Sequence, residues 1–170
     1  MDSSIQVGIC GPGVWVKVNG KGSFLNSDNL KEFAYEMFNR GYREFVMDLA
    51  DCATMDSTFM GTMARLALQL REGEGHLHIV HCGSHNQQLL SGVGLDRLLD
   101  INADGDSPPD CSPVEQNLVG QAPEERKKTQ AKTMLEAHEA LCEAAPENTL
   151  RFKDVLDFLR QELHIDTPRK

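Results

Sequence analysis

Short apolar runs of strand length, alternating with segments of helical period, constrain this chain most. Residues 5–9 and 14–18 alternate apolar and polar side chains on either side of Gly11-Pro12-Gly13, which predicts a β-hairpin. Residues 44–49 and 76–82 are further runs of strand length. The first of these has two apolar faces, as expected of a central strand that is covered on both sides.

Helical segments separate these runs. The first is predicted to begin at Ser27, which would act as the N-cap, and to stop at Gly41 after a loop over residues 20–26. A second helix is expected over 58–72, after a polar loop at 50–54, and a short third helix and last strand by residue 101. The order β-β-α-β-α-β-α-β predicts an α/β fold with parallel neighbours after the hairpin, in a domain covering residues 1–102.

The remaining chain differs in composition. Residues 103–130 are rich in proline and acidic side chains and are predicted to be a linker. Residues 131–165 are expected to form an αα-hairpin broken at Pro146, with Met134, Leu135, His138, Leu141 and Cys142 on the apolar face of its first helix. Two short helices bury too little surface to be stable alone. We therefore expect them to dock on the domain, on a second copy in a homodimer, or on a partner.

Charge and cysteine content exclude several functions. A net charge of −9 does not favour binding to nucleic acid or to anionic membranes. The N-terminus lacks the pattern of a signal peptide, and no apolar stretch has the length of a bilayer, so a cytoplasmic protein is expected. The 5 cysteines are scattered without a C-x-x-C pair, which argues against a disulfide framework or a zinc site.

Residues 55–61, Met-Asp-Ser-Thr-Phe-Met-Gly, lie where a strand is expected to give way to the second helix. The Ser57 hydroxyl would then be exposed at the positive end of the helix dipole, near unpaired backbone N–H groups. A phosphate there would add about −1.5 to −2 charges beside the small residues Gly61 and Ala64. A partner packed on this surface would have to bury that charge at a large cost. On the motif alone, an ordinary N-cap cluster is the simpler interpretation.

The arrangement of hairpin, helix, strand and Asp-Ser-Thr at a helix start, followed by a strand and a helix with Leu89-Leu90, resembles the STAS family over roughly residues 5–101. That family usually has Asp-Ser-(Ser/Thr)-Gly and an aliphatic residue here, and the chain matches at Asp56, Ser57, Thr58 and Met60. The resemblance implies a STAS-like mixed sheet and the role of an anti-sigma-factor antagonist. Such a protein sequesters an anti-sigma factor with serine kinase activity, is inactivated by phosphorylation at Ser57, and is restored by a PP2C-type phosphatase.

The resemblance also implies a partner-binding surface, made from the loop before the first helix and from the start of the second. Its residues are Phe24, Asn26, Ser27, Asp56, Ser57, Thr58, Phe59, Met60, Gly61 and Ala64. Asp56 is implied to orient the Ser57 hydroxyl or to contact the kinase, and Thr58 is the second choice for the phosphate. The chain departs from the family at Phe59, where glycine is usual, and in lacking an acidic residue before Asp28, so its partner is expected to differ from the well-known kinase.

Two other functions stay open. The first alternative is a scaffold or lipid-transport accessory subunit, which would use the STAS surface without phosphorylation. An enzyme has little support, because the sequence lacks G-x-S-x-G, P-loop and G-x-G-x-x-G motifs. His76 and His78 would share one face of a strand without a third ligand. No catalytic residue, cofactor or metal site is expected.

Overall fold

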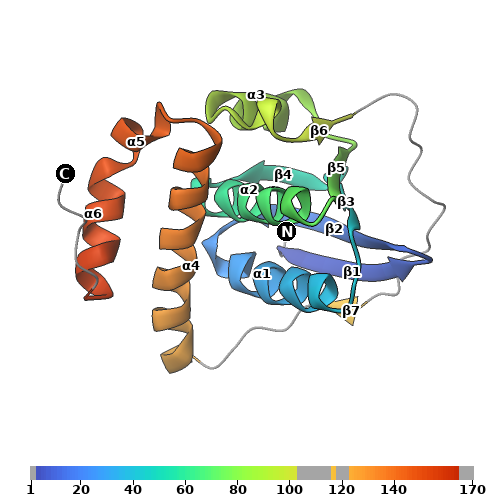
Figure 1. Ribbon diagram of the computed structural model, residues 1–170, viewed down its shortest axis with the longest axis horizontal. Coiled ribbons are helices and arrows are strands. Elements are labelled where there is room, and N and C mark those ends of the chain that lie inside the picture. The colour runs from blue at the N-terminus through green and yellow to red at the C-terminus, as the bar shows by residue number, and fades with distance from the viewer. Residues whose placement is uncertain (1–2, 103–115, 118–122, 165–170) are drawn as a thin grey trace.

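The computed structural model describes residues 3–102, 116–117 and 123–164 of the chain. Helices pack against one mixed sheet, and the C-terminal helices lie along one side of it (Figure 1). The strands are β1 (Ser4–Cys10), β2 (Gly13–Gly22), β3 (Glu44–Asp48), β4 (Cys52–Met55), β5 (His76–Val80), β6 (Asp100–Ile101) and β7 (Gln116–Asn117). The helices are α1 (Phe24–Asn39), α2 (Ser57–Glu72), α3 (Ser84–Gly92), the 3-10 helix η1 (Leu95–Arg97), α4 (Pro123–Ala144), α5 (Asn148–Arg151) and α6 (Lys153–Glu162).

The sheet has the order β6-β5-β3-β2-β1-β7, and β4 pairs with the far end of β2. β1 and β2 form the antiparallel hairpin, with Ile5 opposite Val18 and Ile9 opposite Val14. The pairs β2–β3, β3–β5, β5–β6 and β2–β4 are all parallel. The predicted hairpin followed by β-α units, and with it the α/β class, is therefore confirmed.

One face of the sheet carries the core. Val14, Val16 and Val18 of β2 are at most 1% exposed, whereas Trp15 and Lys17 alternate with them and are partly exposed. α1 and α2 contact each other and pack on the strands from the buried side (Figure 1). This arrangement brings the starts of both helices to the end of the sheet where β2 and β4 finish.

The start of α1 differs from the prediction. β2 continues to Gly22, and α1 begins at Phe24 with Ser23 as its N-cap, whereas a loop over 20–26 and a cap at Ser27 were expected. A capping box explains the earlier start, because the Ser23 side chain accepts from Leu25 N and the Asn26 side chain accepts from Ser23 N. Gly20, at φ 78°, allows the register shift through which β2 goes on to pair with β4.

Three other segments also differ from their predictions. β4 lies inside the expected loop at 50–54, because its backbone pairs with the extended end of β2. The segment after α3 forms η1 before the short β6. Within the expected linker at 103–130, β7 pairs with β1 and α4 already begins at Pro123, while 103–115 and 118–122 lie outside the described residues.

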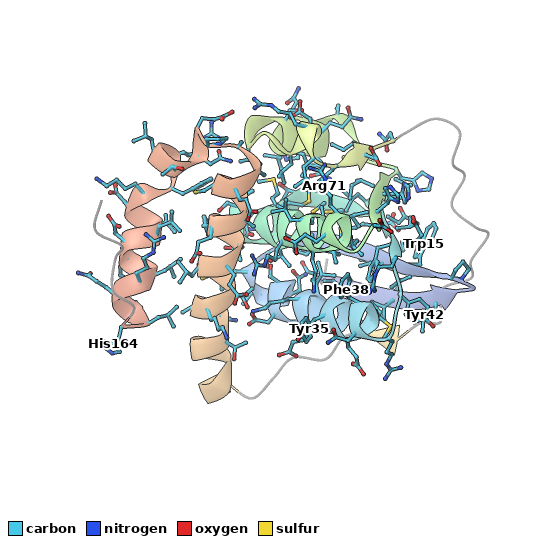
Figure 2. The ribbon with its side chains drawn as sticks, viewed as in Figure 1. Trp15, Tyr35, Phe38, Tyr42, Arg71 and His164 are labelled. Carbon is cyan, nitrogen blue, oxygen red and sulfur yellow. The ribbon has the colours of Figure 1, made fainter. Side chains whose placement is uncertain are left out.

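The predicted C-terminal helices are present and dock on their own chain. α4 packs across α1 and α2, and its residues Ala140 and Leu141 belong to the main core. A second buried cluster of Leu135, Leu156 and Leu159 joins α4 to α6, and Figure 2 shows side chains filling the space between these helices. The division into units at 1–102, 103–130 and 131–165 stays a prediction.

Phe59 is fully buried at the first turn of α2, and it touches the end of β2. A Cβ atom added to Gly22 would lie 2.7 Å from the Phe59 ring, so the glycine makes room for this bulky residue. We predict that Phe59→Ala lowers the free energy of unfolding by about 3–5 kcal/mol, because it leaves a cavity in the core. The matched change Phe158→Ala, at a residue that is 61% exposed, should stay within about 0.5 kcal/mol. Equal effects in urea unfolding would contradict this account of Phe59.

Candidate functional site

The junction between β4 and α2 is fixed by Asp56. Its Oδ1 accepts a hydrogen bond of 2.9 Å from Phe59 N, which caps α2, and its Oδ2 accepts one of 2.9 Å from Phe24 N. Asp56 N in turn donates to the carbonyl oxygen of Gly22 at 2.9 Å. One carboxylate therefore holds the first residues of α1 and α2 together. The structure assigns Asp56 this capping role, and among the described residues the Ser57 hydroxyl does not donate to the Asp56 carboxylate.

Ser57 is the first residue of α2, and α4 lies over it. Ser57 Oγ is 3.0 Å from His138 Nε2, and His138 Nδ1 is 2.6 Å from the carbonyl oxygen of Met134. Since a carbonyl oxygen only accepts, Nδ1 carries the proton and Nε2 accepts from the Ser57 hydroxyl. His138 is 2% exposed, and burial lowers its pKa, which the Met134 carbonyl and the charge of Asp56 offset only in part.

A serine that donates to a neutral imidazole has one feature of an activated nucleophile. The surroundings do not complete such a site. A cavity of about 30 Å³ lies nearby between α1, α2 and α4, which is room for water and not for a substrate. The imidazole is oriented by a backbone carbonyl, and it makes a T-shaped contact with the Phe152 ring at 5.0 Å between centroids. The pair therefore acts as a contact between helices.

The helices α2 and α4 approach each other closely at Gly61, one turn after Ser57. A Cβ atom added to Gly61 would lie 2.7 Å from Ala137 Cβ and closer still to the Ala137 carbonyl group. Ala64 on α2 and Ala140 on α4 are both fully buried. The stripe of small residues that the sequence offers for a partner is thus covered by a helix of the same chain.

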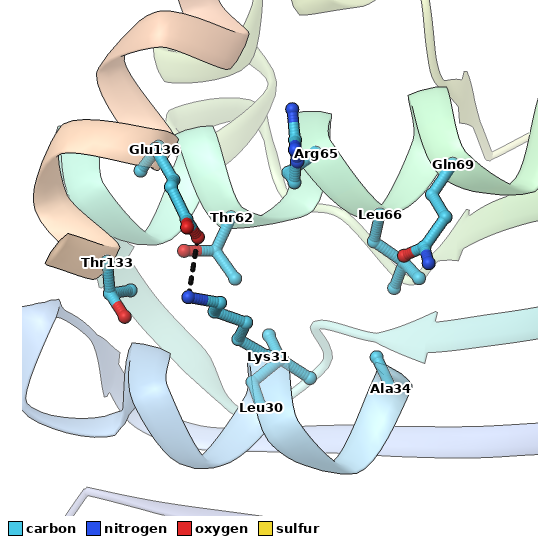
Figure 3. A pocket seen from close by; sticks show the side chains of 10 residues that line it. Leu30, Lys31, Ala34, Thr62, Arg65, Leu66, Gln69, Thr133 and Glu136 are labelled. Atoms are coloured by element: carbon cyan, nitrogen blue, oxygen red, sulfur yellow. Dashed lines mark ion pairs between the residues drawn. The ribbon is translucent and has the colours of Figure 1, made fainter. Parts of the chain in front are cut away.

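Polar contacts fix α4 further along its length. Lys31 Nζ of α1 lies 2.5 Å from Glu136 Oε2, and Figure 3 shows this ion pair beside the small cavity. Asn148 Nδ2, after the end of α4, donates to the carbonyl oxygens of Val93 at 2.9 Å and Leu141 at 2.8 Å. The C-terminal end of α4 is therefore anchored on α3 as well as on α2.

The structure leaves only part of the predicted partner surface open. Phe24 is 39% exposed, and Asn26, Asp56 and Ser57 are partly exposed. The other predicted residues are buried, namely Ser27, Thr58, Phe59, Met60, Gly61 and Ala64. Ser57 is partly exposed, and its hydroxyl lies within hydrogen-bond distance of His138 from α4, whereas a freely exposed hydroxyl was predicted. Sequence analysis placed His138 on an apolar helix face but did not identify what it contacts.

Other reactive groups are held in inert surroundings. Burial raises the pKa of the Cys52 thiol, and it raises that of Cys82 to about 11. His76 Nδ1 and His78 Nε2 both lie within 3.1 Å of the Glu44 carboxylate. Among the described residues, no group of three side chains is arranged to hold a metal ion. The helices in that part of the chain do not combine the length and apolarity needed to cross a bilayer.

An N-terminal hairpin, parallel β-α units and a serine-started helix at the strand ends define a STAS-type α/β domain. The model of the STAS domain family matches residues 5–107, and the chain belongs to this family. The match ends before α4. Curated protein sequences gave no match.

Solved structures support the same fold. A candidate anti-sigma factor antagonist of Thermotoga maritima superposes with a TM-score of 0.54 at 21% identity, covering 57% of this chain and 84% of that one. An anti-sigma factor antagonist of Mycobacterium paratuberculosis gives 0.52 at 17% identity over 59% and 85%. The phosphorylated form of the Bacillus cell fate determinant SpoIIAA gives 0.50 at 12% identity over 59% and 92%. At these identities the likeness establishes the fold.

Asp56 offers a direct test of the junction. We predict that Asp56→Ala lowers the free energy of unfolding by about 1–2 kcal/mol, because the cap of α2 is lost. Asp56→Asn should cost less, since its single carbonyl oxygen keeps one of the two bonds. Urea unfolding of both variants measures the difference. Equal losses would show that the hydrogen bond retained in Asp56→Asn contributes nothing, which would contradict the capping role.

The buried His138 predicts a pH dependence. Its folded-state pKa lies below the unfolded value of about 6.5, so the unfolded chain takes up the proton first as the pH falls, and stability is lost from about pH 7 downward. The free energy of unfolding should therefore drop more between about pH 7.5 and 5.5 in the natural chain than in His138→Gln, which does not titrate. Identical drops would contradict a buried neutral imidazole.

Proposed function

We propose that this protein is a phosphorylation-controlled binding module of the anti-sigma-factor antagonist type. The observation that carries the proposal is the place of Ser57, as the first residue of a capped helix at the end of parallel strands. A phosphate on Ser57 would be stabilised by the helix N-terminus. It would also lie on the stripe of small residues along which another helix packs closely. The phosphate on Ser57 is thus stable on the free domain but costly to bury when a partner packs on this surface.

The comparisons support this proposal at the level of the fold. Two of the matching structures are described as antagonists of anti-sigma factors, and a third is a phosphorylated form. By analogy, the partner is an anti-sigma factor that is also a serine kinase, and a PP2C-type phosphatase removes the phosphate in the cytoplasm. Nucleic acid and membranes are not proposed as partners. Phe24 and Leu25, 39% and 60% exposed beside Asp56, supply apolar contact surface for the complex.

The second candidate is a scaffold or accessory subunit that is not phosphorylated. The observation that favours it is the contact of His138 with Ser57, because the hydroxyl is then hydrogen-bonded within its own chain. A second copy would then pack on the outer side of α5 and α6, where Leu150 is 84% exposed and Phe158 is 61% exposed. Mass spectrometry of the protein from its own cells separates the two candidates, because only the first requires phosphate on Ser57.

The charge argument gives a test by substitution. We predict that Ser57→Asp weakens binding of the anti-sigma factor by about 100-fold or more relative to Ser57→Ala, because an unpaired buried charge costs several kcal/mol. The partner is captured from native cells with Ser57→Ala as bait, and its affinity is then measured by calorimetry. Ala53→Asp places the same charge on an exposed residue nearby and serves as the control. Equal affinities for all three variants would refute the proposed switch.

A further inference from the structure

Helix α4 occupies the face of α2 that the proposed partner needs. Ser57, Gly61 and Ala64 lie along one side of α2, and α4 reaches this side with His138 and Ala137. Ala137 is 1% exposed and Ala140 is fully buried, so the two helices are closely packed here. A protein that packed on the same stripe would overlap with α4.

The docked helix also blocks the chemistry of Ser57. Phosphoryl transfer requires a reacting phosphorus within about 3–3.5 Å of the attacking oxygen, in line with the leaving group. His138 Nε2 lies 3.0 Å from Ser57 Oγ and accepts a hydrogen bond from the Ser57 hydroxyl. With α4 docked, the reacting phosphate and the catalytic base of a kinase cannot reach the side of the Ser57 hydroxyl that faces His138.

Different kinds of contact hold the C-terminal end and the middle of α4. At the C-terminal end, Leu141 and Ala145 are fully buried, and Asn148 and Arg151 bond to backbone carbonyl oxygens at the end of α3. In the middle of α4, the helix is held by the Ser57–His138 bond, by the Lys31–Glu136 ion pair beside the cavity, and by the close packing of Ala137 on Gly61. The Lys31–Glu136 ion pair joins partly exposed side chains and is worth little by itself, whereas His138 is buried. A swing of α4 about its C-terminal end keeps the bonds of Asn148 and Arg151, and it therefore costs less than release of the whole helix.

We infer that α4 is a built-in competitor of the partner, and that the docked chain is a latent state which neither binds the partner nor accepts phosphate. This inference rests on the proposed function of Ser57 and adds a third state to the bound and phosphorylated ones. Release of α4, with α6 attached to it through the cluster of Leu135, Leu156 and Leu159, exposes the stripe and the hydroxyl together. Partner binding, and phosphorylation of Ser57 by that partner, then both require the released form.

Hydrogen exchange of the full-length chain tests the release of α4 without a partner. The amides of residues 129–139 should exchange at least about tenfold faster than those of β3 and β5, with a weaker dependence on urea, as expected of local opening. Ala137→Leu should raise their exchange by a further tenfold or so while β3 and β5 stay unchanged. Glu139→Leu places the same side chain at an exposed position of the same helix and should change nothing.

The inference is overturned if α4 exchanges at the rate and with the urea dependence of β3 and β5, because α4 would then open only by global unfolding. If circular dichroism shows that Ala137→Leu is unfolded, Glu136→Lys replaces it, since this change sets like charges against each other at Lys31. Faster exchange in α4 alone supports release with either variant.

The captured anti-sigma factor tests the competition itself. Ala137→Leu should bind it at least about fivefold more tightly and be phosphorylated faster than the natural chain, because apparent affinity scales with the fraction of open molecules. Unchanged affinity and rate, with α4 shown to be loosened, would overturn the role as competitor. If no anti-sigma factor is captured by any variant, the proposed function fails, while the exchange result still decides whether α4 is released.

Discussion

The crossing of α4 over α2 at Gly61 is the contact on which the geometry of the site depends. Because Gly61 lacks a Cβ atom, the backbone of Ala137 packs directly against α2. The next residue on α4, His138, is thereby brought to hydrogen-bond distance of Ser57, one turn earlier on α2. A larger side chain at position 61 would lift α4, and the Ser57–His138 bond and the Lys31–Glu136 pair would lengthen together. Small residues are commonly what allows two helices to come this close, and here they do so within one chain.

The same crossing explains how a STAS domain can carry an extra helix without a new fold. The family match ends at residue 107, and the sheet with α1, α2 and α3 is complete before α4 begins. α4 adds to the existing core through Ala140 and Leu141, and it uses the surface that the proposed function assigns to a partner. The interpretation of Ser57 therefore changes. In the sequence it is a free hydroxyl at a helix start, whereas in the structure it is a hydroxyl with an internal acceptor.

The sequence predicted the sheet and the main helices well because their signals are local. The alternation around Gly11-Pro12-Gly13, the apolar run at 44–49 and the period of α2 each depend on residues within a few positions. The start of α1 was misplaced because Ser23 and Ser27 are both acceptable caps, and the choice depends on Asn26 completing the capping box. The contact of His138 with Ser57 could not be predicted from such local signals. Ser57 and His138 are 81 residues apart, and an apolar face on a helix indicates that something is buried without indicating against what.

A helix of the same chain competes strongly with a partner for the face of α2, because tethering raises its effective concentration. For short flexible links this concentration reaches the millimolar range. A partner must therefore gain contacts that α4 does not make. Under the function proposed above, Phe24 and Leu25 would provide them, because both side chains are exposed when α4 is docked and Phe24 N is bonded to Asp56. A protein that first packs on these two side chains adds free energy of binding that is independent of α4, and it is then positioned to replace α4 on Gly61 and Ala64. On this view Asp56, which fixes Phe24 to the start of α2, links the exposed Phe24 and Leu25 to the stripe of α2 that α4 covers.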